Sequence, residues 1–256
     1  MYDSRDNCNA IIETATNTMI KGCNTTVIPK TVIVLGENCF YGADINSLTI
    51  PEQIQGLDFW CFDNCYNLKD LKCWATTPPY VNGIGDYFWR NCPKLKKLYV
   101  PGMSLEAYRD DTPWNMIEHI YPFTEQIDMP TSVTIAQGKE QTLNFTLLPE
   151  EADLEALQWT CSDENVATVD AGGLCKALNK GTATITVTST DGSGVTATCE
   201  VTVTEATGIE GLSTSDNVGV AYYTTDGVRL TNNPQQGGIY IRQQGDKRKK
   251  VVIKRR

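Results

Sequence analysis

Apolar residues in the N-terminal half of the chain recur at a fixed spacing. Three stretches repeat the same motif: TVIPKTVIVLGENCF, LTIPEQIQGLDFWCF and LKKLYVP. The first two copies are 22 residues apart, so that Pro29 aligns with Pro51. Within a unit, Leu48 and Ile50 share one face of a strand while Thr49 lies on the other. A single strand-and-turn unit cannot bury its apolar face alone, so the repeats predict stacked coils. We therefore expect a β-rich solenoid.

The solenoid is expected to end in a capping helix. The alternation stops shortly after Pro101, where SLEAYRDDTPWNMIEHI follows. Thr112 and Pro113 combine an N-cap residue with a first-turn proline, and His119 would lie on the same helix. One helical face would carry three apolar residues, Trp114, Ile117 and Ile120. Such a helix would cover the last coil and close a first domain over residues 1–122.

Two further β regions follow. Short alternating runs, the last of them GVTATCEVTVTE, are separated by Gly, Asp and Pro turns over residues 126–205 and predict a β-sandwich. Val201 and Val203 fall on one face of that last run. Residues 206–256 contain the runs VGVAYY, VRL, GGIYIRQ and KVVIKR and predict a small C-terminal β-domain. About fifty residues form a marginal core alone, so this domain is expected to dock on a neighbour. The predicted fold class is mainly β throughout.

The first domain resembles the leucine-rich repeats of BspA-like bacterial surface proteins. Their units follow the pattern I-P-x-x-V-x-x-I-G-x-x-A-F-x-x-C-x-x-L, and this chain departs from it with Cys39 and Cys61 in place of the usual alanine. The resemblance implies a protein of the outer cell surface or the extracellular medium. No charged and apolar leader precedes the first unit, so we expect the secretory signal to lie outside this sequence.

The two later domains also resemble known families. The segments LPEEA, WTCSDENVATVD, GTATITV and DGSGVTATCEVTV are similar to the bacterial Ig-like domain of group 2, which implies a spacer or adhesive module. The segments GVRL and GGIYIR resemble the C-terminal sorting domains of secreted Bacteroidetes proteins.

Composition narrows the function classes. The net charge of −9 argues against a nucleic-acid partner for the body of the protein. No apolar run approaches the ~18 residues that a membrane helix needs. Basic residues crowd the C-terminus from Lys247 to Arg256, where valines and an isoleucine interrupt them. We interpret them as a solvated strand, and the alternative is a patch that binds an anionic surface or nucleic acid.

Candidate catalytic and metal-binding groups are few. Cys39 and Cys61, like Cys65 and Cys92, occupy equivalent positions in successive coils, where parallel side chains meet the disulfide dihedral angle poorly. We expect these to be reduced, buried thiols. The chain has a single histidine, His119, and no cysteine pair shows metal spacing with it. The sequence therefore predicts neither an enzyme nor a cofactor or metal site.

Binding is the remaining class of function. Alternation predicts that polar and aromatic residues project, exposed, from one strand face of consecutive coils, and it places Trp74 beside the inserted loop. The predicted ligand-binding set is Thr49, Asp70, Lys72, Trp74, Lys97 and Tyr99. The first hypothesis is adhesion to a host or bacterial extracellular protein through the solenoid. The alternative is a glycan-binding module that uses Trp74 and Tyr80, although Trp74 packed over the coil edge would serve structure alone. A third reading is a spacer array, and the oligomeric state stays open.

Overall fold

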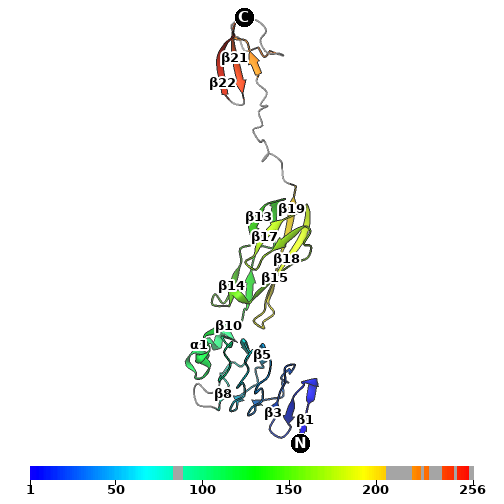
Figure 1. Cartoon of the computed structure of the whole chain (residues 1–256), viewed down its shortest axis with the longest axis vertical. Helices are drawn as coiled ribbons and strands as arrows, with labels where there is room; N and C mark the ends of the chain where they lie inside the picture. The colour runs from blue at the N-terminus through cyan, green and yellow to red at the C-terminus, as the bar shows by residue number, and fades with distance from the viewer. Residues whose placement is uncertain (83–88, 206–220, 226–227, 231–237, 245–246, 254–256) are drawn as a thin grey trace. The chain divides into compact units, whose positions relative to one another are not determined.

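The computed structural model describes residues 1–82, 89–205, 221–225, 228–230, 238–244 and 247–253. The protein is mainly β, and the described residues contain one α-helix, α1 (Leu105–Asp110). The chain forms two compact units, Met1–Glu205 and Ala206–Arg256 (Figure 1). None of the helices in the described part is long and apolar enough to cross a membrane.

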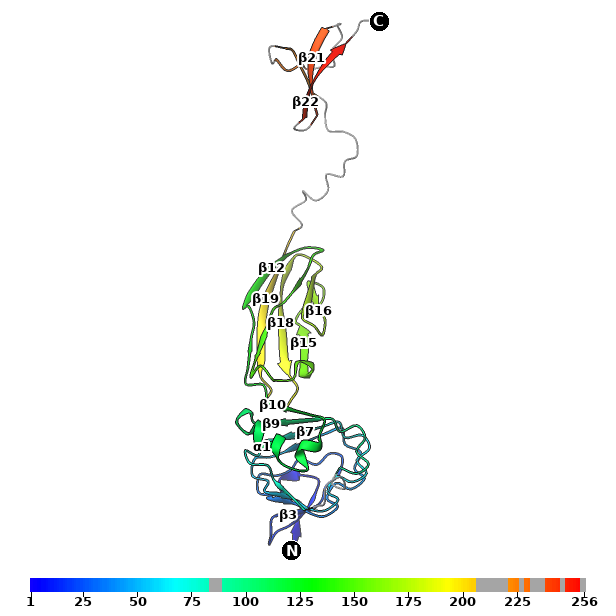
Figure 2. The ribbon, with the colours of Figure 1, turned by 90° about the vertical axis from the view of Figure 1, so that its left-hand side faces the viewer.

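Two sheets with parallel ladders build residues 1–122, which we call the repeat region. The six-stranded sheet has the order β1 (Tyr2–Asp3), β2 (Ile11–Glu13), β3 (Thr18–Lys21), β4 (Val34–Leu35), β6 (Gly56–Leu57) and β8 (Tyr80–Val81), and it is parallel from β3 onward. The four-stranded sheet is parallel throughout, with the order β10 (His119–Pro122), β9 (Lys97–Val100), β7 (Asp70–Cys73) and β5 (Ser47–Ile50). Figure 2 shows β7, β9 and β10 side by side. From β4 to β9, successive strands alternate between the two sheets.

The repeat spacing becomes a set of stacked rows in the core. Leu48 pairs in register with Leu71, and Leu71 with Leu98, and all three are buried. Phe40 and Phe62, one repeat apart, stack with ring centroids 5.8 Å apart. Repeat-equivalent residues therefore pack on one another, which buries the apolar face that no single unit can bury alone.

All ten cysteines are free in the structure. Two of the buried thiols donate to carbonyl groups of the preceding repeat: Cys65 Sγ lies 3.1 Å from Phe40 O, and Cys92 Sγ lies 3.0 Å from Phe62 O. Burial, the largest cause, raises the pKa of the Cys61 thiol well above its ordinary value. The thiols in this core behave as small apolar groups.

The predicted capping helix over Thr112 to Ile120 is wrong. The α-helix is α1, which lies earlier, between the 3₁₀ turns η3 (Gly102–Ser104) and η4 (Trp114–Met116). Ile117 is extended, and His119 lies in β10, not on a helix. Pairing with β9 in register satisfies backbone groups on both strands, and this tertiary gain outweighs the local helix signal. The end of the core is still covered, by Leu105, Tyr108, Trp114 and Ile117.

A β-sandwich occupies the rest of the first unit. One sheet has the order β12 (Ser132–Ala136), β19 (Thr196–Thr204), β18 (Gly181–Ser189) and β15 (Leu157–Cys161). A second sheet contains β13 (Glu140–Thr142), β17 (Leu174–Ala177) and β16 (Ala167–Val169), and a third pairs β11 (Gln126–Asp128) with β14 (Thr146–Leu148). Val201 and Val203 are buried in its core, as the alternation predicts.

The second unit contains a three-stranded antiparallel sheet of β20 (Ala221–Tyr223), β21 (Gly238–Gln244) and β22 (Lys247–Ile253). The predicted run VRL contributes one bridge, between Tyr223 and Arg229. Four of the basic residues near the C-terminus, Lys247 to Lys250, lie in β22. The last three, Lys254 to Arg256, lie outside the described residues.

Candidate functional site

Five of the six predicted binding residues lie on one face of the β10-β9-β7-β5 sheet. The parallel register pairs Thr49 with Lys72 and Lys72 with Tyr99, and it pairs Asp70 with Lys97. Residues two apart on a strand share a face, so the structure gathers these five in two adjacent rows. The repeat spacing of the sequence was sufficient to predict this arrangement.

The sandwich covers the β9 end of this face. Lys97 Nζ lies 2.8 Å from Asp153 Oδ2 and 2.9 Å from Glu155 Oε2, and Tyr99 donates its hydroxyl to Asp153 Oδ2 at 2.7 Å. Asp153 precedes the 3₁₀ turn η5 (Leu154–Ala156), and its Oδ1 accepts the Glu155 amide. Asp153 is 3% exposed and Tyr99 5%. The expectation that the whole face is exposed is therefore wrong at Tyr99.

The pKa values of Lys97 and Tyr99 are both raised at this contact. Burial opposes the charged form of Lys97, but hydrogen bonds to Asp153 and Glu155 outweigh it and raise the pKa of Lys97. Burial and the Asp153 carboxylate, in that order, raise the pKa of Tyr99 well above its ordinary value. At neutral pH the lysine is charged and the phenol keeps its proton, so both donate to Asp153.

A second buried carboxylate, Asp191, holds the segment that follows β10 against the loop between β18 and β19. Asp191, 1% exposed, accepts the Thr124 amide at 2.6 Å through Oδ2 and the Ser193 amide at 2.8 Å through Oδ1. Burial raises the pKa of Asp191, but the hydrogen bonds from Ser193 and Thr124 outweigh it and hold this pKa below its ordinary value. Lys72 Nζ donates to Thr190 O at 2.8 Å. We call the contacts made by Asp153, Thr190 and Asp191 the junction.

Aromatic rings line the junction. Trp74 and Phe123 stack with centroids 3.9 Å apart and planes 12° apart, and Tyr99 stacks on Tyr121 at 6.0 Å. Ala156 of the sandwich packs in the same apolar cluster. No local sequence pattern links these residues, because their partners are tens of positions away in the chain.

The β5 end of the same face is open. Thr49 is exposed, and Asp70 is half-buried and accepts the Ser47 hydroxyl. Thr49 and Trp74 border a hollow of about 350 Å³, whose walls include Lys30, Pro51, Glu52 and Gln53. The structure thus places four predicted residues at or beside the junction, and it leaves Thr49 and Asp70 outside.

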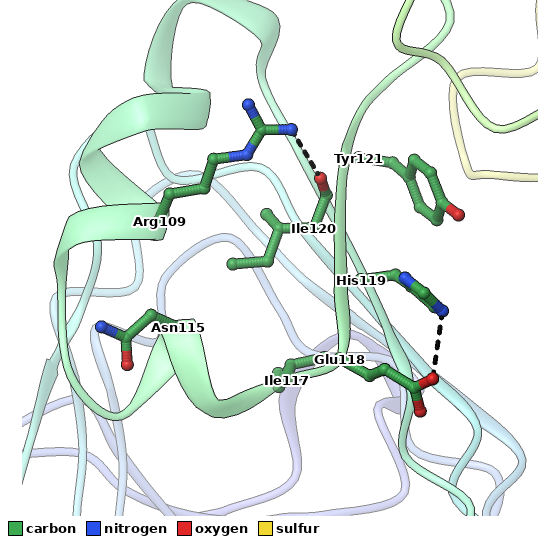
Figure 3. Close-up of a pocket in the computed structure, with 7 residues that line it drawn as sticks. All are labelled: Arg109, Asn115, Ile117, Glu118, His119, Ile120 and Tyr121. Atoms are coloured by element: carbon green, nitrogen blue, oxygen red, sulfur yellow. Dashed lines mark hydrogen bonds and ion pairs between the residues drawn. The ribbon is translucent and has the colours of Figure 1, made fainter.

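Another hollow, of about 330 Å³, lies along β10 (Figure 3). Its charged groups are paired: Arg109 Nη1 lies 2.8 Å from Glu106 Oε1, and Glu118 Oε2 lies 2.8 Å from Lys96 Nζ. Among the described residues, no group of three or more His, Cys, Asp or Glu side chains is arranged to hold a metal ion. Both hollows present an aromatic ring beside exposed polar groups, Tyr121 in this one and Trp74 in the other.

Fold and site together define a modular β-protein in which parallel repeats are joined to a sandwich. Residues 7–111 match the family model of the BspA type leucine rich repeat region, in 6 copies, and residues 122–207 match the bacterial Ig-like domain (group 2). The chain therefore carries a BspA-type leucine-rich repeat region followed by a bacterial Ig-like domain, which confirms these two sequence predictions.

Known relatives match parts of the chain. Over 108 residues, 41% of this chain, it is 36% identical to a 3-O-alpha-D-galactosyl-alpha-L-arabinofuranosidase from Bifidobacterium longum subsp. longum. A 54-residue match, 21% of this chain, is 48% identical to the kappa-carrageenase of Pseudoalteromonas carrageenovora. The chain spans 10% and 14% of these two relatives. The surface layer protein SbsC, domains 1-6, matches at 15% identity over 54% of this chain and 26% of that chain, with a TM-score of 0.29.

Proposed function

We propose that this chain is a non-enzymatic extracellular binding protein. In this proposal the repeat region is a solenoid that recognises a host or bacterial extracellular protein, and the Ig-like domain is its rigid support. The C-terminal unit is proposed to be a sorting-type domain, as in secreted Bacteroidetes proteins. The junction supports the rigid arrangement, because Lys97 and Tyr99 of the sheet face donate to the buried Asp153 and Lys72 donates to Thr190 O.

A group of exposed aromatic side chains carries the proposal of protein recognition. Five aromatic residues of the repeat region are each between 41% and 57% exposed: Tyr41, Phe59, Trp60, Tyr66 and Tyr80. The rings of Phe59 and Trp60 lie 5.9 Å apart. Tyr and Trp are enriched among the residues that dominate binding energy at protein interfaces. We propose this aromatic group as the main contact surface, with Thr49 and Asp70 as ligand-binding residues at the open end.

Trp60 adds a backbone observation. Its φ of 55° is in the left-handed region, which bulky residues rarely adopt, and the repeat-equivalent Asn38 has the same φ. Asparagine tolerates this conformation far better than tryptophan does. A tryptophan kept there at a conformational cost supports a role in binding. Lys72, Lys97 and Tyr99 are proposed to act through the junction, by positioning the repeat region.

A binding assay with a matched control tests this function. The full chain is applied to a panel of immobilised extracellular-matrix and bacterial surface proteins, and the variant Phe59→Ala/Trp60→Asn is compared with Met103→Ala, which changes an exposed apolar residue elsewhere in the repeat region. We expect the double variant to lose binding while its circular dichroism is unchanged. Equal binding by the double variant and the control would refute the aromatic surface.

Glycan binding is the second candidate. The two relatives named above act, by their names, on an arabinofuranosyl linkage and on carrageenan, and this chain matches only a small part of each. We propose that the part of these enzymes that this chain matches binds their glycan substrates. A glycan array probed with the full chain tests this candidate directly.

A further inference from the structure

The hollow at Trp74 spans three successive coils. Lys30 comes from one, Pro51 to Gln53 from the next, and Trp74 from the third. Its volume of about 350 Å³ falls within the range of small-ligand sites, about 300–1,000 Å³. The hollow lies at the open end of the sheet face, so a ligand can reach it without displacing the Ig-like domain.

Trp74 interrupts a row of prolines. The register that pairs Ile50 with Cys73 and Lys72 with Tyr99 places Trp74 between Pro51 and Pro101. Proline at this position suffices for the neighbouring coils, so the repeat itself does not require an indole ring. The ring is also held in place, because Phe123 stacks on it at 3.9 Å. A fixed aromatic surface binds a ligand at a lower entropic cost than a mobile one.

The polar walls determine the ligand chemistry. Lys30 and Glu52 are both exposed, and they contribute one positive and one negative charge. Gln53 Nε2 donates to Pro29 O at 3.0 Å, which orients this amide, and the Thr49 hydroxyl can both donate and accept. The walls thus offer donors and acceptors with no net charge, beside an aromatic ring. Glu52 would repel a strongly anionic ligand, and Lys30 would repel a cationic one.

We infer that this hollow binds a neutral pyranose sugar of a glycan, with its apolar ring face on Trp74 and its hydroxyl groups on Lys30, Glu52 and Gln53. This inference rests on the glycan-binding form of the proposed function and assigns its site and ligand class. Aromatic side chains with one apolar face suit such rings, and neutral hydroxyl groups match walls that mix donors and acceptors.

The test uses the full chain and isothermal titration with neutral gluco-, galacto- and manno-oligosaccharides, with a sulfated galactan as the anionic counterpart. We expect binding of at least one neutral oligosaccharide. Glu52→Gln/Gln53→Ala should weaken it about tenfold, corresponding to about 1.4 kcal/mol. The control Glu37→Gln, an exposed glutamate on another turn of the repeat region, should bind as the unmodified chain does.

Trp74→Ala should abolish binding, but Trp74 also packs on Phe123, so the Glu52/Gln53 variant decides the assignment. No binding of any neutral oligosaccharide, binding of the sulfated galactan alone, or binding unchanged in Glu52→Gln/Gln53→Ala would each overturn the inference. Capture of a protein partner through Phe59 and Trp60 would persist in that variant. Sugar binding that is unchanged in that variant would refute this site but not glycan binding by the chain, whereas no sugar binding by the unmodified chain would refute both.

Discussion

The two ends of one parallel sheet face have opposite environments. On β9, Lys97 and Tyr99 are held against Asp153 of the Ig-like domain, whereas on β5 Thr49 is exposed beside a hollow. The strands share one register and one repeat, so the repeat does not decide which end binds a ligand. Polar and aromatic residues on a strand face indicate an interface. On β9 these residues contact another part of the same chain, whereas on β5 they are exposed.

The largest expected effect is at the covered end. Asp153→Ala leaves Lys97 and Tyr99 without their shared acceptor, and each hydrogen bond to a charged group is worth about 1.5–3 kcal/mol. The loss of stability is measured as the free energy of unfolding of the full chain in urea. Hydrogen exchange of the β9 and β10 amides then locates it. Glu155→Ala is the control, since Glu155 is exposed and a surface pair contributes about 0–1 kcal/mol. Equal losses in the two variants would contradict a buried junction.

Acid should loosen the same end. The folded pKa of Asp191 is lowered, so its stabilisation is present above the unfolded value of about 3.9 and is lost as pH falls through the folded pKa. Each unit of lowering corresponds to about 1.4 kcal/mol. Urea midpoints between pH 7 and pH 2 should fall more steeply for the unmodified chain than for Asp191→Asn. Parallel profiles for the two proteins would exclude this role of Asp191.

The sequence predicts the repeats better than the junction, for a physical reason. Stacking is set by local spacing, so Leu48, Leu71 and Leu98 could be aligned from the sequence alone. The contact between Lys97 and Asp153 joins residues 56 positions apart and depends on how two finished surfaces meet. Local helix signals at Thr112 failed for the same reason, because the open edge of β9 offered a partner strand.

The same limit applies to the candidate site. Trp74 in place of a repeat proline is readable from the sequence, whereas the hollow beside it requires the folded positions of Lys30, Glu52 and Gln53. Asp153 and Asp191 were not singled out, since a lone aspartate in a turn has many local roles.

A smaller effect is expected at Gly192, which lies in the junction. Its φ is +112°, and a Cβ there would lie 3.1 Å from Lys72 Cδ and 3.5 Å from a Phe123 ring carbon. Gly192→Ala should therefore destabilise the protein by about 1–3 kcal/mol, as measured by urea unfolding. Gly194→Ala, at φ +67° with no atom near its Cβ, is the matched control and should cost less. A larger cost at Gly194 would mean that backbone strain alone, without the contact, sets the effect.

The smallest effect is expected at the open end. Thr49 lies in the same row as Tyr99, two strands away, yet its side chain is exposed. Thr49→Ala should change the free energy of unfolding by no more than about 0.5 kcal/mol, as for most surface substitutions. Tyr99→Phe removes one hydrogen bond to a buried carboxylate and should cost about 1.5–3 kcal/mol. Both are measured in the same urea series. A cost at Thr49 equal to that at Tyr99 would show that the β5 end supports the fold as the β9 end does, and the distinction between a closed junction and an open surface would fail.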